Sequence, residues 1–328
     1  MIHTRGLARD YRAKKEIVTA VKGIDIDVEP GELVAFLGPN GAGKSTTLRM
    51  LTTSLRPSRG TATVVGHDVH TQAKRIRGKI GYIGQGNGAG HNHRILDELV
   101  DHGRFYGLSS AESKRRAGQL LENFGLTSQA RRAIGTLSGG QRRRVDIAMG
   151  MMHRPKLLFL DEPSTGLDPQ NRVNLAEEIG RLRSELGMTV FLTTHYLEEA
   201  DQLAERVMII DGGAVIAEGS PTELKATLAG DRIRIGLADE MAAKAAAVFV
   251  GEHLPTARET TVEDATLTTA VDNGEATLPK LLRGLDSVGL EARSASVRLP
   301  TLDDVFLSLT GRTLRDADQA AQTEGSQG

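Results

Sequence analysis

The sequence predicts an α/β protein in which a buried parallel sheet is followed by a small α+β domain. Short apolar runs have the length of fully buried strands, and they lie at 33–37, 157–160 and 189–194. A helical pattern at 171–186 separates the second run from the third, as in a strand–helix–strand unit. Beyond Glu223 the pattern changes to alternation with polar residues, which indicates an antiparallel strand, at Ile233, Ile235 and Leu237.

The first apolar run leads directly into a glycine-rich loop. Glycines let the backbone curl so that successive N–H groups point inward at anionic oxygens. Lys44 supplies a cation for the β- and γ-phosphates, and Ser45 supplies a hydroxyl for Mg²⁺ and begins a helix whose N-terminus favours anions. We therefore expect a nucleoside triphosphate and Mg²⁺ to be bound by Gly38, Pro39, Asn40, Gly41, Ala42, Gly43, Lys44, Ser45 and Thr46. The loop alone is consistent with kinases, GTPases and ATPases.

The apolar run at 157–160 ends in two carboxylates, Asp161 and Glu162. This arrangement can place Asp161 near the Mg²⁺ shell and Glu162 near the attacking water. An apolar strand that ends in acidic residues is also an ordinary strand-to-turn junction. The glycine-rich loop favours the functional interpretation, in which these are the acidic groups of a hydrolase.

A second candidate anion site lies at 137–141, which reads LSGGQ. Ser138 is placed to cap the following helical stretch, and Gly139 and Gly140 leave backbone N–H groups bare. The segment is not a continuation of the first loop. We therefore expect Ser138, Gly139, Gly140 and Gln141 to bind a phosphate that a second copy of the protein delivers.

In combination these motifs resemble the nucleotide-binding subunit of an ATP-binding cassette (ABC) transporter. The glycine-rich loop, LSGGQ, the LLFLDEP strand, the segment 164–168 and His195 follow the order of that family within residues 1–225. The resemblance implies the P-loop NTPase fold, with a RecA-like core, an antiparallel β subdomain and a helical subdomain.

The resemblance also implies roles for four further residues. Gln85 would lie in the Q-loop and reach Mg²⁺, Asp168 would be the D-loop carboxylate that crosses a dimer interface, and His195 would contact the γ-phosphate and position the water. Together with Glu162 and Lys44, Gln85 and His195 form the predicted catalytic set. Tyr11 would stack on adenine; the alternative is an ordinary surface tyrosine, since the segment 12–17 after it is longer than usual.

Composition limits the other function classes. The chain has 328 residues, of which 39% are hydrophobic, enough for more than one domain. No apolar run approaches the ~20 residues of a membrane helix, and residues 1–5 lack the apolar segment of a signal peptide. The absence of cysteine excludes disulfides and thiolate metal sites. A formal net charge of −1 argues against general nucleic-acid binding.

Two groups of residues invite interpretations that we do not favour. The basic runs at 114–116, 131–132 and 142–144 fall on predicted helices, and we expect solvated helix faces rather than a nucleic-acid surface. His91, His93 and His102 lack a carboxylate framework for a metal. We expect these three histidines in a mobile loop after Gln85.

We divide the chain into an ATP-binding domain at 1–225, with a helical subdomain at about 87–153, an α+β domain at 226–311 and a disordered tail at 312–328. In the α+β domain the periodicity predicts helices at 239–249 and 278–285 and strands at 265–271 and 292–299. Thr301 is placed to cap a last helix with one apolar face, made of Leu302, Val305, Phe306 and Leu309.

The last part of the chain sharpens the resemblance. The ending LDDVFLSLTG, the RRRVDIA helix and the segment HYLEEADQLAERV are similar to drug-resistance exporters of the daunorubicin type. This implies efflux of a drug-like or hydrophobic compound through a separate transmembrane permease, with the chain peripheral on the cytoplasmic face of the cell membrane. The cargo stays open, with lipids and peptides as alternatives. The sequence also leaves open whether the dimer is a homodimer or a heterodimer, and what the α+β domain does.

Two other function classes are consistent with part of the pattern. One is a soluble ABC ATPase of DNA repair or translation, but such proteins usually carry two cassettes or zinc and coiled-coil insertions. The other is a scaffold subunit that binds ATP without turnover, which Glu162, His195 and LSGGQ disfavour. We expect instead two copies in a head-to-tail, ATP-dependent dimer that hydrolyses ATP.

Overall fold

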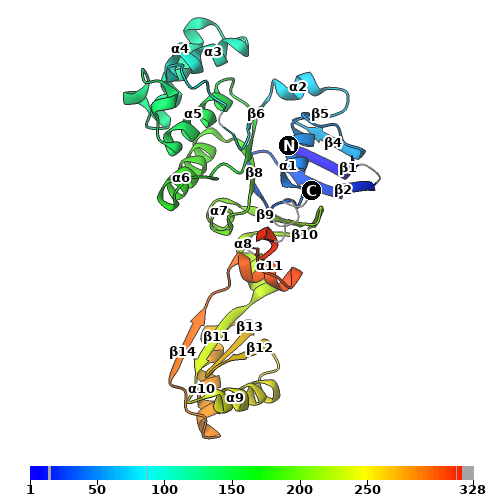
Figure 1. Cartoon of the computed structure of the whole chain (residues 1–328), viewed down its shortest axis with the longest axis vertical. Coiled ribbons are helices and arrows are strands. Elements are labelled where there is room, and N and C mark those ends of the chain that lie inside the picture. The colour runs from blue at the N-terminus through cyan, green and yellow to red at the C-terminus, as the bar shows by residue number, and fades with distance from the viewer. Residues whose placement is uncertain (14–15, 87, 315, 320–328) are drawn as a thin grey trace. The chain divides into compact units, whose positions relative to one another are not determined.

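The computed structural model describes residues 1–328 apart from 14–15, 87, 315 and 320–328 (Figure 1). The chain divides into two compact units, Met1–Gly219 with Arg315–Gly328, and Ser220–Leu314. Each unit has a separate hydrophobic core. Residues 220–225, which the sequence pattern placed in the first domain, belong to the second unit.

The centre of the first unit is a six-stranded sheet in the order β10-β9-β3-β8-β7-β6. The pairs from β9 to β6 are parallel, and β10 pairs antiparallel at the edge. The three predicted apolar strands are confirmed and are buried along their whole length. The strands are β3 (Leu33–Leu37), β6 (Ile80–Ile83), β7 (Leu157–Asp161), β8 (Thr189–Thr194), β9 (Arg206–Asp211) and β10 (Ala214–Gly219).

A second sheet of the first unit is antiparallel, in the order β2-β1-β4-β5. The outer residues of the hairpin that its first two strands form, such as Ile17 and Val18, are exposed. Helix α1 (Lys44–Leu51) lies between the two sheets and contacts strands of both. The strands are β1 (Ile2–Ala13), β2 (Glu16–Val28), β4 (Arg59–Val64) and β5 (His67–Asp68).

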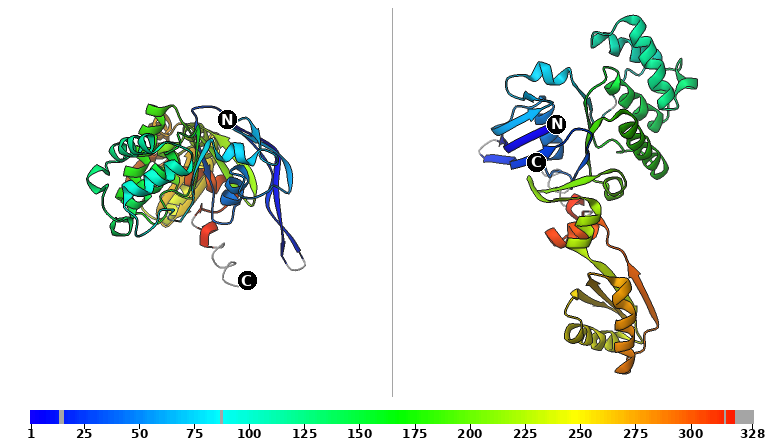
Figure 2. Two further views of the ribbon diagram at one scale, coloured as in Figure 1. Left: turned by 90° about the horizontal axis from the view of Figure 1, so that it is seen from above. Right: turned by 180° about the vertical axis from the view of Figure 1, so that it is seen from behind.

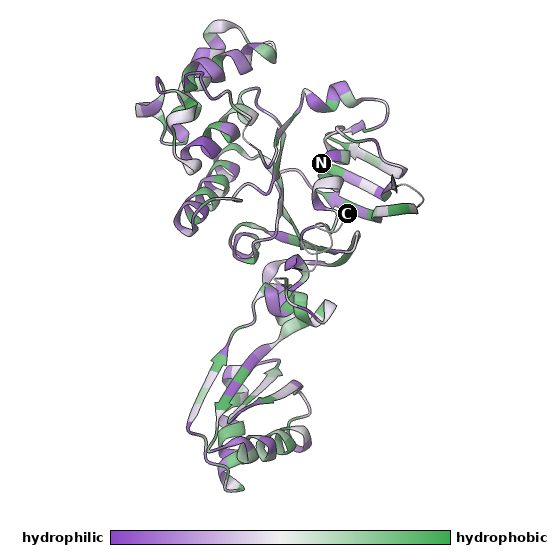
Figure 3. Ribbon diagram, in the orientation of Figure 1, coloured by the Kyte–Doolittle hydropathy of each residue, from purple (hydrophilic) through white to green (hydrophobic). Residues whose placement is uncertain are grey.

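Among the other helices of the first unit, α2, α5 and α7 contact strands of the six-stranded sheet, whereas α3 and α4 pack against each other and against α5. In Figures 1 and 2, α5 and α6 lie on the opposite side of this sheet from the antiparallel sheet. Figure 3 shows these helices striped with hydrophobic and hydrophilic residues, as expected when one face packs on a core. They are α2 (Ala73–Arg77), α3 (Ile95–Phe105), α4 (Ser110–Asn123), α5 (Gly139–Met151), α6 (Pro169–Leu186) and α7 (Leu197–Leu203), with 3₁₀ turns at Thr127–Gln129 and Ile134–Thr136.

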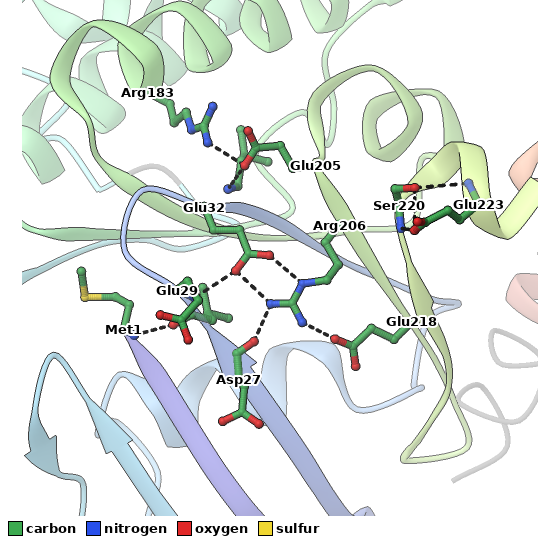
Figure 4. A network of polar contacts seen from close by, with 12 residues as sticks. Met1, Asp27, Glu29, Glu32, Arg183, Glu205, Arg206, Glu218, Ser220 and Glu223 are labelled. Atoms are coloured by element: carbon green, nitrogen blue, oxygen red, sulfur yellow. Dashed lines mark hydrogen bonds and ion pairs between the residues drawn. The ribbon is translucent and has the colours of Figure 1, made fainter.

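Arg206, at the start of β9, is the centre of a polar network that joins four strand ends (Figure 4). Its guanidinium makes a bidentate pair with Glu32, at 2.6 and 2.9 Å, and also contacts Glu218 and the Asp27 carbonyl. The hydrogen bonds and negative charges of Glu32 and then Glu218 raise the pKa of Arg206. Because bidentate pairs are directional, the network fixes the chain entering β3 against β9, just upstream of the glycine-rich loop.

The second unit has the order β-α-β-β-α-β, a split β-α-β arrangement. Its sheet is antiparallel in the order β12-β13-β11-β14. The strand β12 was not predicted, because it is polar and mostly exposed, so that its residues do not alternate. The elements are α8 (Pro221–Leu224), a π-helical turn at Lys225–Ala229, β11 (Asp231–Gly236), α9 (Glu240–His253), β12 (Arg258–Glu263), β13 (Thr266–Val271), α10 (Gly274–Ser287), β14 (Ser294–Arg298) and α11 (Leu302–Thr310).

The predicted helix at 278–285 begins earlier than expected. Asn273 caps α10 at Gly274, and Pro279 falls inside the helix. The first turn, 274–277, carries no large apolar side chain, so the apolar periodicity does not extend to it.

The tail does not begin at Arg312 as predicted. Residue 314 and residues 316–319 are helical, and Leu314 and Ala317 are buried. These two apolar residues are three positions apart and so fall on one face of a helical turn. The remainder of the predicted disordered tail, 320–328, lies outside the described residues. In the part of the chain that the structure describes, no helix is long and apolar enough to cross a membrane.

Helix α11 begins at the predicted cap. Thr301 and Asp304 form a reciprocal capping box. The Asp304 carboxylate is 9% exposed and also pairs with Arg232 at 3.2 Å and Arg298 at 2.6 Å. One side chain thus satisfies the helix N-terminus and neutralises two cations of the neighbouring strands.

Replacing Asp304 with alanine should therefore lower the stability of the second unit by about 1–3 kcal/mol. A cap is lost, Arg298 loses its carboxylate partner, and Arg232 keeps only Glu259. Hydrogen exchange of the β11 and α11 amides in the full-length chain would measure this effect. Asp286→Ala, at an exposed position of α10, is the control. Equal protection in both variants would contradict the assignment.

Candidate functional site

The glycine-rich loop connects β3 to α1 with a backbone that requires glycine. Gly41 and Gly43 have φ angles of 79° and 105°, in the left-handed region that side chains disfavour. A Cβ atom at Gly38 would lie 2.2 Å from the Ile210 carbonyl oxygen. The loop borders a cavity of about 190 Å³, lined by Ala20, Pro39, Asn40, Gly41, Gly43, Lys44, Ser45, Thr46, Gln85 and Glu162.

Lys44 is buried beneath this loop. Its Nζ donates to the carbonyl oxygens of Gly38 at 2.6 Å and Pro39 at 3.0 Å, and it lies 3.3 Å from Glu162 Oε1. Burial lowers the pKa of Lys44, while Glu162 opposes that effect. The ammonium group therefore crosses beneath the loop and reaches the acidic end of β7.

Three oxygen-bearing side chains meet beside Lys44. The Ser45 hydroxyl donates to Asp161 Oδ1 at 3.0 Å, and Gln85 Nε2 lies 3.3 Å from Ser45 Oγ. Asp161 Oδ1 also accepts from the Thr193 hydroxyl at 2.7 Å. Hydroxyl, carboxylate and amide groups are the donor types that Mg²⁺ prefers, and the structure brings the three predicted ligands together.

Glu162 lies between Lys44 and His195. Its Oε2 atom is 3.3 Å from His195 Nδ1 and accepts from the Thr165 hydroxyl at 3.3 Å. Burial acts to raise the pKa of Glu162, but His195 and Lys44 outweigh it and lower the pKa to about 2. The backbone of Glu162 has φ = 46°, a left-handed conformation that is uncommon for a residue with a long side chain.

The lowered pKa of Glu162 makes stability depend on pH. Because the folded pKa is below the ordinary value of 4.5, the unfolded chain binds more protons in this window. The stabilisation should therefore be complete above about pH 4.5 and be lost as the pH falls toward 2. Urea unfolding of the nucleotide-free protein at several pH values, with Glu162→Gln as the reference, would measure it. Parallel pH curves for both proteins would contradict the proposed ion pairs.

The segment 137–141 forms the start of α5. Ser138 is the N-cap as predicted, and its hydroxyl accepts from the Gln141 N–H at 3.2 Å while Gln141 Oε1 accepts from the Ser138 N–H at 3.1 Å. The sequence pattern missed this reciprocal box, which the S-x-x-Q spacing indicates. None of these residues lines the 190 Å³ cavity.

The start of α5 packs against the start of α6. A Cβ atom at Gly140 would lie 2.9 Å from Asn171 Oδ1, and Asn171 in turn bonds to Asp168, the N-cap of α6. The Asn171 backbone N–H lowers the pKa of Asp168. Asp168 and Pro169 give the cap-and-proline signal of a helix start, so the helix begins two residues before the predicted 171.

Comparison with known proteins identifies the family. Residues 21–165 match the family model described as ABC transporter, and residues 219–310 match the C-terminal domain of DrrA1-3-like ATP-binding proteins. The chain is 42% identical to the daunorubicin/doxorubicin resistance ATP-binding protein DrrA of Streptomyces peucetius, over 98% of this chain and 97% of that protein. The chain belongs to the ATP-binding subunits of ABC transporters.

Further relatives of this ABC subunit agree. The linearmycin resistance ATP-binding protein LnrL of Bacillus subtilis is 37% identical over 96% of this chain and 100% of that protein. The dimeric ATP-binding cassette MJ0796 in a post-hydrolysis state with ADP and Pi superposes with a TM-score of 0.62 at 27% identity, covering 67% of this chain and 98% of that one. The predicted fold and family are confirmed, and the ABC subunit binds and hydrolyses ATP.

Of the ligands predicted for the subunit's own site, Tyr11, Gly38, Ala42 and Asp161 do not line the cavity beside the P-loop. Ala42 is buried, and its carbonyl accepts from the Gly213 N–H at 3.0 Å. Tyr11 pairs with Val18 in the hairpin and has the Arg9 guanidinium 4.8 Å from its ring centre. Its stacking on adenine stays a prediction.

The structure corrects the interpretation of the basic runs in this ABC subunit. Arg143 and Arg116 are 6% and 9% exposed and are not on solvated faces. Their guanidinium groups donate to backbone carbonyls, partners that a sequence pattern does not reveal. His102 also differs from expectation, since it lies in α3 rather than in the loop after Gln85.

Two further contacts at the P-loop of the ABC subunit were not predicted. Thr193 donates its hydroxyl to Asp161, as described above, and accepts from the Glu162 N–H at 3.1 Å. Asp318 accepts from the Asn40 N–H at 2.6 Å, so a carboxylate of this chain contacts a loop whose N–H groups suit anions. The Thr-Thr-His order after an apolar strand is the signal that can locate Thr193.

Proposed function

We propose that this chain binds MgATP on the loop 38–46 and hydrolyses it to drive export through a membrane permease. One observation carries the proposal. The side chains that ATP hydrolysis requires meet around the P-loop, namely Lys44, Ser45, Gln85, Asp161, Glu162 and His195. Phosphoryl transfer from a nucleoside triphosphate to water uses this combination of phosphate loop, metal-type oxygens and acidic base.

Ser45, Gln85 and Asp161 would hold Mg²⁺. Their hydroxyl, amide and carboxylate oxygens fit this ion. The Ser45 hydroxyl is already within hydrogen-bonding distance of both the Asp161 carboxylate and the Gln85 amide group. When bound, the ion supplies a Lewis acid that neutralises charge on the β- and γ-phosphates.

Lys44 would exchange partners when ATP binds. In the structure its ammonium pairs with Glu162, whereas the phosphates of ATP offer a stronger anionic partner. The exchange would remove one cation from Glu162 and raise the pKa of its carboxylate from the value of about 2. Glu162 would then accept a proton from the attacking water, and His195 would orient that water toward the γ-phosphate.

A second copy would complete the site in a head-to-tail dimer. Ser138, Gly139, Gly140 and Gln141 present the N-terminus of α5, which favours an anion. These residues are absent from the lining of the chain's own P-loop cavity, which supports a role toward the partner's ATP. Asp168 would approach the same interface. Two ATP molecules between the copies would favour the closed dimer, and hydrolysis would remove this preference.

We place the contact with the permease beside Gln85, where closure of the dimer would be transmitted to it. The chain would lie peripherally on the cytoplasmic face of the membrane. A cavity of about 310 Å³ lies there, and its lining includes Gly86, Tyr82 and Tyr106. Tyr106 stacks on His153 with ring centres 3.9 Å apart, and Phe105 next to it is 84% exposed. An exposed aromatic residue beside such a cavity is typical of a protein interface, and we assign a cytoplasmic segment of the permease to it.

The cargo that we propose is a drug-like or hydrophobic compound. The names of the relatives DrrA and LnrL state resistance to daunorubicin/doxorubicin and to linearmycin. Near full-length similarity to DrrA includes the second unit, which supports the same class of transporter.

ATP-dependent accumulation of an anthracycline in inverted membrane vesicles tests this proposal. The vesicles would contain the chain and its permease partner, with Glu162→Gln in place of the native chain as the inactive control. Uptake that depends on ATP and disappears in the control is expected. ATPase activity without uptake would contradict the cargo, and a vesicle ATPase rate equal in both preparations would contradict the active site.

A further inference from the structure

Arg143 is a buried cation in the second turn of α5. Its Nε donates to the Pro163 carbonyl at 2.7 Å, Nη1 donates to the Gly84 carbonyl at 2.7 Å, and Nη2 donates to the Asp161 carbonyl at 3.4 Å. Only 6% of the residue is exposed. A planar guanidinium can donate in several directions at once, and all three acceptors belong to segments that carry proposed site residues.

Two of these carbonyls lie on either side of Glu162. The Asp161 carbonyl belongs to the peptide group that joins Asp161 to Glu162, and the N–H of the same peptide donates to Thr193 O and Oγ1, both at 3.1 Å. Glu162 itself has the left-handed φ of 46°. Such a conformation persists only where surrounding contacts determine it. Arg143 and Thr193 supply these contacts from opposite sides.

The third carbonyl fixes the segment that carries Gln85. Gly84 directly precedes Gln85, so a bond to its carbonyl orients the peptide group that joins the two residues. One turn further along α5, Asp146 Oδ1 accepts from the Gly88 and Ala89 N–H groups at 3.1 and 3.2 Å. Helix α5 therefore bonds to the chain on both sides of Gln85.

We propose that Arg143 is a positioning residue for ATP hydrolysis, which holds Glu162 and Gln85 in their working geometry from the helix that begins with Ser138. The inference rests on the proposed function, because that function assigns the roles of Glu162 and Gln85. It also has a consequence for the dimer. A change at the N-terminus of α5, where the partner's ATP would bind, would reach Glu162 of this chain's own site through Arg143.

The neighbouring Arg144 provides a matched control. It lies on the same helix and pairs with Glu178 of α6 at 2.9 Å. The Arg144 contacts that the structure gives thus connect two helices and involve no proposed site residue. A variant of Arg144 therefore reports what the loss of a half-buried arginine of α5 does to the fold alone.

The test compares Arg143→Met, Arg143→Lys and Arg144→Met in the full-length chain. ATP binding is titrated first, and kcat is expressed per ATP-binding site so that misfolded protein does not contribute. For Arg143→Met we expect kcat to fall about 10- to 100-fold, since small misplacements of catalytic groups have effects of this size. The Kd for ATP should stay within about twofold, because Lys44 and the loop are unchanged. Arg143→Lys should lose less, and Arg144→Met should keep its kcat.

A second comparison distinguishes a loss of positioning in Arg143→Met from a general loss of folded structure. In a Glu162→Gln background, Arg143→Met should cause little further loss of kcat, because both changes act through the same group. A normal kcat in Arg143→Met would overturn the inference. It would also be overturned if the fold-loss of kcat in the double variant equalled the product of the losses in the two single variants. If Arg143→Met binds no ATP, the kcat of Arg143→Lys serves as the test instead. A wild-type kcat in Arg143→Lys would then overturn the inference. An unreduced kcat in Glu162→Gln alone would instead overturn the proposed function.

Discussion

Replacing Glu162 with glutamine should lower kcat by about 10²–10⁴-fold, the contribution of a general base. Glutamine keeps the size of the side chain and can still accept from Thr165, but it cannot take a proton from water. ATP should bind as well as before, because Lys44 and the loop amides remain. Removal of the negative charge also frees Lys44 from its ion pair, so that affinity for ATP should stay equal or rise.

Phosphate release under saturating ATP measures this change, with a parallel titration of a fluorescent ATP analogue. Glu198→Gln is the control, since Glu198 is an exposed glutamate in the helix after His195. A Glu162→Gln protein with the wild-type rate would exclude Glu162 as the base. A variant that also lost ATP binding would show a role in the fold instead.

Replacing Lys44 with alanine should weaken ATP binding itself. A hydrogen bond to a charged group contributes about 1.5–3 kcal/mol, which corresponds to roughly a 10- to 100-fold higher Kd. The loop also loses the two bonds from Nζ to the Gly38 and Pro39 carbonyls, which adds to the effect. Turnover should fall as well, because we propose that Lys44 contacts the phosphates.

Titration with a fluorescent ATP analogue measures the Lys44→Ala effect. Lys74→Ala, at an exposed position in α2, is the matched control. An unchanged Kd in Lys44→Ala would place the nucleotide away from the P-loop. In that case the cavity of about 190 Å³ would need another ligand.

The elements that the sequence predicted best are those whose geometry depends on neighbouring residues alone. The P-loop is one, because its glycines have to adopt left-handed φ angles whatever surrounds them. The Thr301 cap of α11 is another. Both signals are contained within a few consecutive residues.

Elements that depend on distant parts of the chain were missed. Arg143 has the same local surroundings as its neighbours in a run of three arginines, and only the carbonyls at 84, 161 and 163 distinguish it. β12 is polar apart from Val262, which packs against the core, and pairs with the edge of β13. Leu314 and Ala317 belong to a polar segment and become buried only in the folded chain.

The two separate hydrophobic cores have a consequence for how the protein melts. One contains Phe36, Phe159 and Phe191, and the other contains Ile233 and Leu285. Because each core is internally cooperative, calorimetry should resolve two heat-absorption peaks rather than one. ATP stabilises only the unit that contains its site, so adding it should move one peak to higher temperature and leave the other where it is. The melting temperature of the second unit would thus serve as an internal control for the effect of ligands on the melting temperature of the first.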